Sequence, residues 1–106
     1  MKIAIVRGGG VAGLASKTRL DSDALSVPDA EAFEERVRSS GLLTMEDRPN
    51  RAPRHPDELL YAVTVDDGER ERTHSFAEDD LTEGMRSLVE WVDARPESDH
   101  EVGPPG

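Results

Sequence analysis

Three glycines near the start of the chain have a spacing that could do chemistry. Gly8, Gly10 and Gly13 form a G-x-G-x-x-G motif directly after the apolar run of residues 3–6. In dinucleotide-binding enzymes this motif turns a strand into a helix, and the N-terminus of that helix binds the pyrophosphate. The same glycines could instead close a β-hairpin whose loop is presented to a partner protein. The residues that follow the motif decide between these two interpretations.

Residues 14–21 alternate between two faces, as a strand does. Leu14 and Leu20 fall on one face with two small polar residues between them, and charged residues occupy most of the other face. This period of two favours a half-exposed strand over a helix. The next strong apolar strand begins only at residue 59, so no acidic residue closes a second strand where a ribose would need it. We therefore favour the hairpin. The alternative is a flavin or nicotinamide fragment of an oxidoreductase that uses the three glycines.

The bulk composition excludes several function classes. With 106 residues the chain has room for one domain, and the absence of Cys rules out disulfides, thiolate zinc sites and thiol nucleophiles. Its net charge of −10 argues against nucleic acid or an anionic membrane as partner, because phosphate would repel this surface. We expect neither a metal nor a cofactor. No signal peptide or membrane-spanning segment is evident, so we expect a cytoplasmic protein that is monomeric when free.

The remaining elements predict an α+β domain. Residues 1–7 form a strand that is apolar on both faces and is therefore expected at the centre of its sheet. Residues 28–40 form a helix, with Ser26 and Asp29 spaced as a capping box, Pro28 in the first turn and Gly41 as the stop. Two strands at residues 59–66 and 69–76 are joined by a two-residue turn at Asp67 and Gly68. A second helix begins at the acidic residues 78–80 and ends before Pro96. The order is therefore ββαββα, with a four-stranded, mainly antiparallel sheet and both helices packed on one face.

The domain is expected to cover residues 1–95. Within it, residues 44–57 form a long loop that contains three prolines and is locally basic. Residues 96–106 are predicted to be a disordered acidic C-terminal tail.

We identify no catalytic residues. Adjacent carboxylates are plentiful, and the pairs at residues 34–35, 66–67 and 79–80 fall on a helix face, in a turn and at a helix N-terminus, where each has a structural explanation. Acid–base chemistry requires a pocket that shifts pKa values, and no pattern in the sequence indicates one. His55 and His74 are expected at the surface. The glycine-rich run is the feature that a simple scaffold does not need, because two residues suffice to close a hairpin.

The sequence resembles the emfourin family of small protein inhibitors. The resemblance lies in the opening MKI…RGGGVAGL, in the segment YAVTVDDG and in the closing DLTEGMRSLVEWV, in the same order and at matching spacing. These inhibitors act on protealysin-like, thermolysin-type zinc metalloproteases, so the resemblance implies a binding protein and not an enzyme. A domain that binds an unrelated protein is the remaining alternative.

The resemblance also implies a site. We expect the loop to occupy the active-site cleft of the protease, with Val11 or Leu14 mimicking the bulky apolar residue that such clefts favour after the scissile bond. The expected protease-binding residues are Gly8, Gly9, Gly10, Val11, Ala12, Gly13 and Leu14. Because the first helix carries the chain back to the same end of the sheet, Arg48, Arg51, Arg54 and His55 are predicted as a secondary contact.

Overall fold

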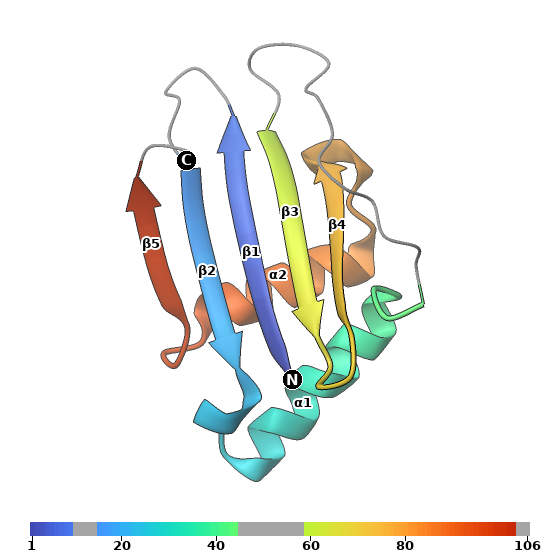
Figure 1. Cartoon of the computed structure of the whole chain (residues 1–106), viewed down its shortest axis with the longest axis vertical. Helices are drawn as coiled ribbons and strands as arrows, with labels where there is room; N and C mark the ends of the chain where they lie inside the picture. The colour runs from blue at the N-terminus through green and yellow to red at the C-terminus, as the bar shows by residue number, and fades with distance from the viewer. Residues whose placement is uncertain (10–14, 45–58, 104–106) are drawn as a thin grey trace.

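The protein folds as an antiparallel sheet covered on one face by two helices (Figure 1). The computed structural model describes residues 1–9, 15–44 and 59–103. The strands are β1 (Lys2–Gly9), β2 (Ala15–Asp21), β3 (Leu59–Asp66), β4 (Glu71–Ala77) and β5 (Asp99–Gly103). The helices are α1 (Val27–Ser40) and α2 (Glu83–Ala94), with 3₁₀ turns η1 (Ser22–Ala24) and η2 (Glu78–Asp80). The α+β class and the single helical layer agree with the prediction.

The number of strands does not agree, because the sheet has five strands in the order β4-β3-β1-β2-β5. The first six strands and α-helices follow the predicted ββαββα order, and β5 comes after them. It lies in the segment that we had assigned to a disordered tail and pairs antiparallel with β2. The backbone of β2 thereby gains a second neighbour, and polar side chains join the two strands, since Arg19 forms an ion pair with Glu101 at 2.8 Å.

Strand β1 lies at the centre of the sheet because its sequence is apolar on both faces. Ile3 and Ile5 point toward the helices and are almost completely buried, together with Val63 and Val65 of the neighbouring β3. The core cluster also includes Phe33 from α1 and four residues of α2, which are Met85, Leu88, Val89 and Val92. Burial of such side chains contributes roughly 1.5–3 kcal/mol each and holds the helices on this face of the sheet.

Local signals set both ends of α1 as predicted. The Ser26 side chain accepts a hydrogen bond from the Asp29 backbone N–H at 3.4 Å, and Pro28 lies in the first turn. Gly41 ends the helix with φ of 82°, a left-handed conformation that glycine adopts without steric cost.

Helix α2 begins later than predicted. The acidic residues 78–80 form η2 as a separate turn, and Thr82 is the N-cap, its side chain accepting from the Met85 N–H at 3.2 Å. Gly84 stands where α2 crosses α1, because a Cβ at this position would lie 3.1 Å from the Ser39 carbonyl oxygen. Neither described α-helix is long and apolar enough to cross a membrane.

The β3–β4 connection is longer than predicted. Asp66 pairs with Glu71, so four residues form the loop, and positive φ occurs at Gly68 (96°) and not at Asp67. Another correction concerns His74 on β4, which is completely buried and not at the surface. Its Nε2 lies 3.1 Å from the Leu42 carbonyl oxygen, an acceptor, so this nitrogen carries the proton.

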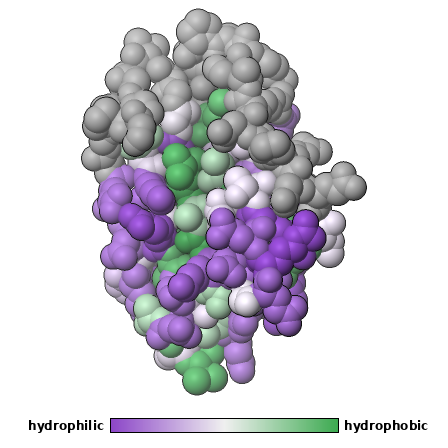
Figure 2. Space-filling model, in the orientation of Figure 1, coloured by the Kyte–Doolittle hydropathy of each residue, from purple (hydrophilic) through white to green (hydrophobic). Residues whose placement is uncertain are grey.

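Both described α-helices lie on the same face of the sheet, and no helix of the described residues covers the second face (Figure 1). The alternation of β1 and β3 places the half-buried Ala4, Val6 and Ala62 on this face. Figure 2 shows hydrophobic side chains along the middle of the face and hydrophilic ones on both sides.

Candidate functional site

The predicted site lies at the end of the sheet where β1 terminates and β2 begins. Gly9 is the last residue of β1 and Ala15 is the first residue of β2. Gly8 and Gly9, which we expected in the loop, instead extend β1 and pair with Leu60 and Leu59 of β3. The other predicted protease-binding residues, Gly10, Val11, Ala12, Gly13 and Leu14, lie outside the described residues.

The antiparallel pairing of β1 and β2 decides between the two interpretations of the glycine motif. Ile3 is the partner of Leu20 and Ile5 is the partner of Thr18, so Ala15–Asp21 runs back along β1 as an extended strand. A dinucleotide site needs a helix at this place, with its N-terminus facing the pyrophosphate. The predicted strand is thus confirmed over residues 15–21, and the dinucleotide interpretation lacks the element that it requires.

The start of β3 and the end of β5 lie at the same end of the sheet. Leu59, the first residue of β3, is the partner of Gly9, and Gly103, the last residue of β5, is the partner of Ala15. We call this end of the sheet, defined by Gly9, Ala15, Leu59 and Gly103, the glycine end. The chain therefore enters β3 beside the point where β1 ends, as the predicted topology requires. The basic residues expected as a secondary contact, Arg48, Arg51, Arg54 and His55, lie outside the described residues.

Packing against the described residues does not require glycine at position 8. Among those residues, a Cβ on Gly8 would meet only the Ala15 Cβ, at 3.8 Å, which is an ordinary van der Waals contact. At Gly84 the situation is different, because an added Cβ would crowd backbone atoms of Ser39 and Ser40 at 3.1 and 3.3 Å. The fold thus explains Gly84 and leaves the choice of glycine at position 8 to another cause.

A cluster of Arg7, Tyr61 and Asp93 lies next to the glycine end, between the sheet and α2. Arg7 donates a hydrogen bond from Nη2 to Asp93 Oδ2 on α2. The guanidinium carbon of Arg7 also lies 5.6 Å from the ring centroid of Tyr61, its partner on β3. Sequence analysis missed this cluster because its members are far apart in the chain and none belongs to a motif.

The opposite end of the sheet, which we call the turn end, is defined by Lys2, Asp21, Asp66 and Glu71. Here the β3–β4 loop is fixed by its own side chains. Asp67 Oδ1 accepts hydrogen bonds from the backbone N–H groups of Glu69 and Arg70, each at 2.9 Å. These bonds, with a further one from Arg72, lower the pKa of Asp67 to about 2. The carboxylate therefore has a structural role in the loop.

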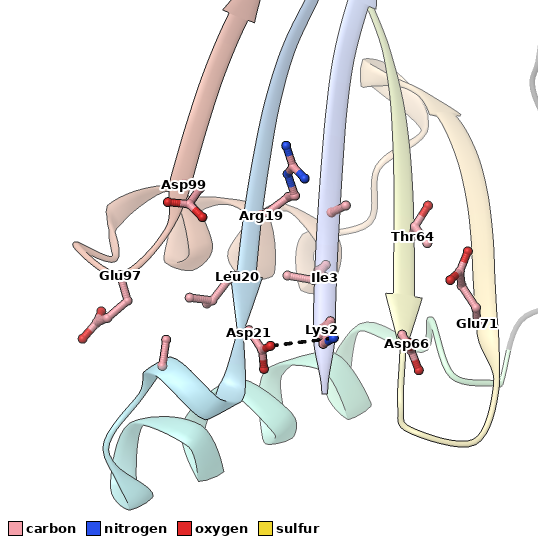
Figure 3. A pocket seen from close by; sticks show the side chains of 12 residues that line it. Lys2, Ile3, Arg19, Leu20, Asp21, Thr64, Asp66, Glu71, Glu97 and Asp99 are labelled. Atoms are coloured by element: carbon pink, nitrogen blue, oxygen red, sulfur yellow. Dashed lines mark ion pairs between the residues drawn. The ribbon is translucent and has the colours of Figure 1, made fainter.

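An open hollow of about 370 Å³ lies on the helix-free face near the turn end (Figure 3). Its lining includes five carboxylates, on Asp21, Asp66, Glu71, Glu97 and Asp99, and two basic side chains, Lys2 and Arg19. Lys2 and Asp21 form an ion pair at 4.0 Å, and both side chains are largely exposed. The hydroxyl of Thr64, which also lines the hollow, is hydrogen-bonded to the hydroxyl of Thr73 at 3.1 Å.

The described residues also lack a metal-binding constellation, since no group of three His, Cys, Asp or Glu side chains among them could hold an ion. His74, whose Nε2 is hydrogen-bonded inside the core, has no such partners around it. The described part of the site thus consists of paired strand ends, which fix where the segment between β1 and β2 begins and ends.

Comparison with known proteins gives one match. No curated protein and no solved structure shows significant similarity to the chain. The sequence model of the Emfourin family matches residues 5–93, which span β1 to the last turn of α2. The range begins inside β1, at Ile5, and includes the whole glycine segment and β2. It therefore contains the motifs on which the resemblance was based, except for the opening residues MKI. The chain therefore belongs to the emfourin family.

Proposed function

We propose that this protein inhibits a thermolysin-like zinc metalloprotease by inserting the segment Gly8–Leu14 into the active-site cleft. Membership of the emfourin family supports a role as a metalloprotease inhibitor. The observation that carries the specific proposal is the antiparallel pairing of β1 with β2, because it makes the glycine segment the connection of a hairpin. The strands on both sides fix where this segment starts and ends.

The mechanism is exclusion of the substrate. Glycines let the inhibitor backbone approach the walls of a narrow cleft, since they carry no side chain. Val11 or Leu14 would fill the pocket that receives the apolar residue after the scissile bond. Removal of the zinc ion is not part of the proposal, because the chain has no Cys and only three His.

A secondary contact would come from the basic residues Arg48, Arg51, Arg54 and His55. Its support is the pairing of Leu59 with Gly9, which brings the chain into β3 beside the glycine end. An acidic rim around the protease cleft would attract these side chains, mainly by accelerating association. In this proposal the free inhibitor is a monomer that binds the protease in a 1:1 complex.

The test is a titration of a thermolysin-like protease with the purified protein, using a peptide substrate. We expect stoichiometric loss of activity, and we expect Val11→Asp to raise the inhibition constant at least about 100-fold, because burying an unpaired charge costs several kcal/mol. Val27→Asp is the matched control. Val27 is the exposed large hydrophobic residue on α1 (73% exposed), and its substitution should leave inhibition unchanged.

Two outcomes would contradict the proposal. Full protease activity at a large excess of inhibitor, over several thermolysin-like enzymes, would remove the function itself. Equal inhibition by the Val11→Asp and Val27→Asp variants would keep an inhibitor but place its contact surface elsewhere on the molecule.

A further inference from the structure

Arg7 is the last residue before the two glycines at the end of β1, and its side chain lies on the helix-covered face. It reaches α2, where Nη2 donates to Asp93 Oδ2, and it lies over the Tyr61 ring of β3. One side chain thus joins the end of β1 to a neighbouring strand and to the helical layer, 86 positions away in sequence.

The geometry of the Arg7–Asp93 pair is poor for stability. A bidentate contact would use both carboxylate oxygens and two guanidinium nitrogens. Here Arg7 Nε and Asp93 Oδ1 are buried and, within the described part of the chain, have no hydrogen-bond partner. Unsatisfied buried polar atoms are unfavourable, and an ion pair that is only partly buried adds little to stability in return.

The position of Asp93 adds to this argument. It lies in the last turn of α2, which contains no basic residue. The partial negative charge at a helix C-terminus favours cations and disfavours a carboxylate. Asp93 therefore does not stabilise its own helix, and its described partner is the guanidinium group below the glycine end.

We propose that Arg7 and Asp93 are positioning residues, which fix the direction in which the chain leaves β1 toward the partner-binding segment. Because the pair ties β1 to the helical layer, the hairpin cannot tilt independently of α2. The direction of the chain at the end of β1 is then fixed before binding, so less conformational entropy is lost when the partner binds. This inference rests on the proposed inhibitory function.

The chain offers a matched control at the turn end. Arg72 and Asp67 form an ion pair at 3.1 Å, with side chains 15% and 24% exposed, compared with 22% and 33% for Arg7 and Asp93. The two pairs have similar burial but lie at opposite ends of the sheet, the Arg7–Asp93 pair near the glycine end and the Arg72–Asp67 pair near the turn end. Loss of either pair removes an ion pair from the fold, whereas only the Arg7–Asp93 pair lies next to the glycine segment.

The experiment compares Arg7→Gln, Asp93→Asn, their double variant and Arg72→Gln. With a protease that the wild-type protein inhibits, we expect each change at Arg7 or Asp93 to raise the inhibition constant about tenfold. The double variant should be no worse than the singles, because both remove the same interaction. Arg7→Lys, which keeps the charge, should recover part of the loss, and Arg72→Gln should inhibit like the wild type. All assays are run well below the unfolding temperature of each variant.

A second readout does not need a protease. Backbone amide relaxation and hydrogen exchange in the free protein should show greater mobility at Gly8, Gly9, Ala15 and Ser16 in Arg7→Gln and Asp93→Asn, but not in Arg72→Gln. If no protease is inhibited, the proposed function fails, and this measurement still tests the positioning role. Unchanged amide behaviour in all variants, or inhibition that falls in proportion to stability including in Arg72→Gln, would overturn the inference.

Discussion

The two ends of the sheet solve the same problem, the reversal of a strand, in different ways. At the turn end, side chains of the loop bind its own backbone. Asp66 Oδ1 accepts from the Gly68 N–H at 2.9 Å, and Asp67 accepts from two further N–H groups. The N-terminal ammonium group is also fixed there, since it donates to Ser22 Oγ at 2.9 Å. The turn end is therefore stabilised by hydrogen bonds between residues that lie there themselves.

At the glycine end the sequence provides no such side chains. Residues 8–13 are four glycines, one valine and one alanine. None of them has a side-chain oxygen that could accept a hydrogen bond from a backbone N–H group of the turn. The polar contacts lie below the segment, at Arg7 and Asp93. We infer that one end of the sheet is organised for stability and the other for contact with a partner.

Deletion of residues 99–106 should have the largest effect, because it removes β5 and makes β2 an edge strand. Five cross-strand pairs are lost, which corresponds to about 1–5 kcal/mol at roughly 0.2–1 kcal/mol each. The last of these pairs supports Ala15, so inhibition should weaken as well. Urea unfolding and protease titration measure the two effects.

The control for this deletion is removal of residues 104–106 alone, which leaves β5 intact and should change neither quantity. Identical stability of the full chain and the longer deletion would show that β5 contributes nothing in solution. The division between the two ends would then depend on the β1–β2 hairpin alone.

Valine substitutions at Gly84 and Gly8 should have opposite effects. Gly84→Val should destabilise the protein by about 1–3 kcal/mol, because its side chain would be forced against the α1 backbone at Ser39. Gly8→Val should leave stability unchanged or raise it slightly, since β-branched residues suit a strand and the nearest atom is 3.8 Å from the added Cβ. Thermal unfolding gives both values.

Inhibition should show the reverse order. Gly8→Val should weaken it if the protease approaches the backbone at this position, whereas Gly84→Val should inhibit normally below its unfolding temperature. Normal inhibition by a stable Gly8→Val variant would exclude Gly8 from the contact and shorten the site to residues beyond the end of β1.

The sequence predicted those features that depend on neighbours in the chain. The cap at Ser26, the stop at Gly41 and the central position of β1 follow from local residue types and from alternation. The extended form of residues 15–21, on which the choice of function depended, also follows from local alternation. Features of this kind need no knowledge of which segments meet in space.

The features that were missed depend on distant partners. Residues 99–103 are mostly polar and follow Pro96, so nothing local distinguishes them from a tail, and their pairing partners lie 80 to 88 positions earlier. His74 is buried because the Leu42 carbonyl oxygen, from another element, binds its ring. The β3–β4 connection was predicted as a two-residue turn at Asp67 and Gly68, whereas the Asp67 carboxylate binds the backbone N–H groups of Glu69 and Arg70 and so includes them in the loop.

The smallest expected effect is the pH dependence of the turn end. The pKa of Asp67 is lowered from 3.8 to about 2 in the folded protein, first by the backbone N–H groups of Glu69 and Arg70 and then by Arg72. A carboxylate with a lowered folded-state pKa contributes stability that is fully present above its unfolded value and is lost as the pH falls toward its folded value. The contribution of Asp67 should therefore disappear between about pH 4 and pH 2.

Urea unfolding of the wild type, Asp67→Asn and Arg72→Gln at pH 5, 3.5 and 2.5 measures this contribution. The stability difference between wild type and Asp67→Asn should shrink as the pH falls, because asparagine keeps an acceptor oxygen for the loop but carries no charge to lose. Arg72→Gln should retain most of the pH dependence, because the two backbone donors remain. If Arg72→Gln removes the dependence as completely as Asp67→Asn does, the ion pair and not the loop backbone holds the turn end. The two ends of the sheet would then rely on the same kind of contact, one arginine paired with one aspartate, and the difference between them would lie in the glycine segment alone.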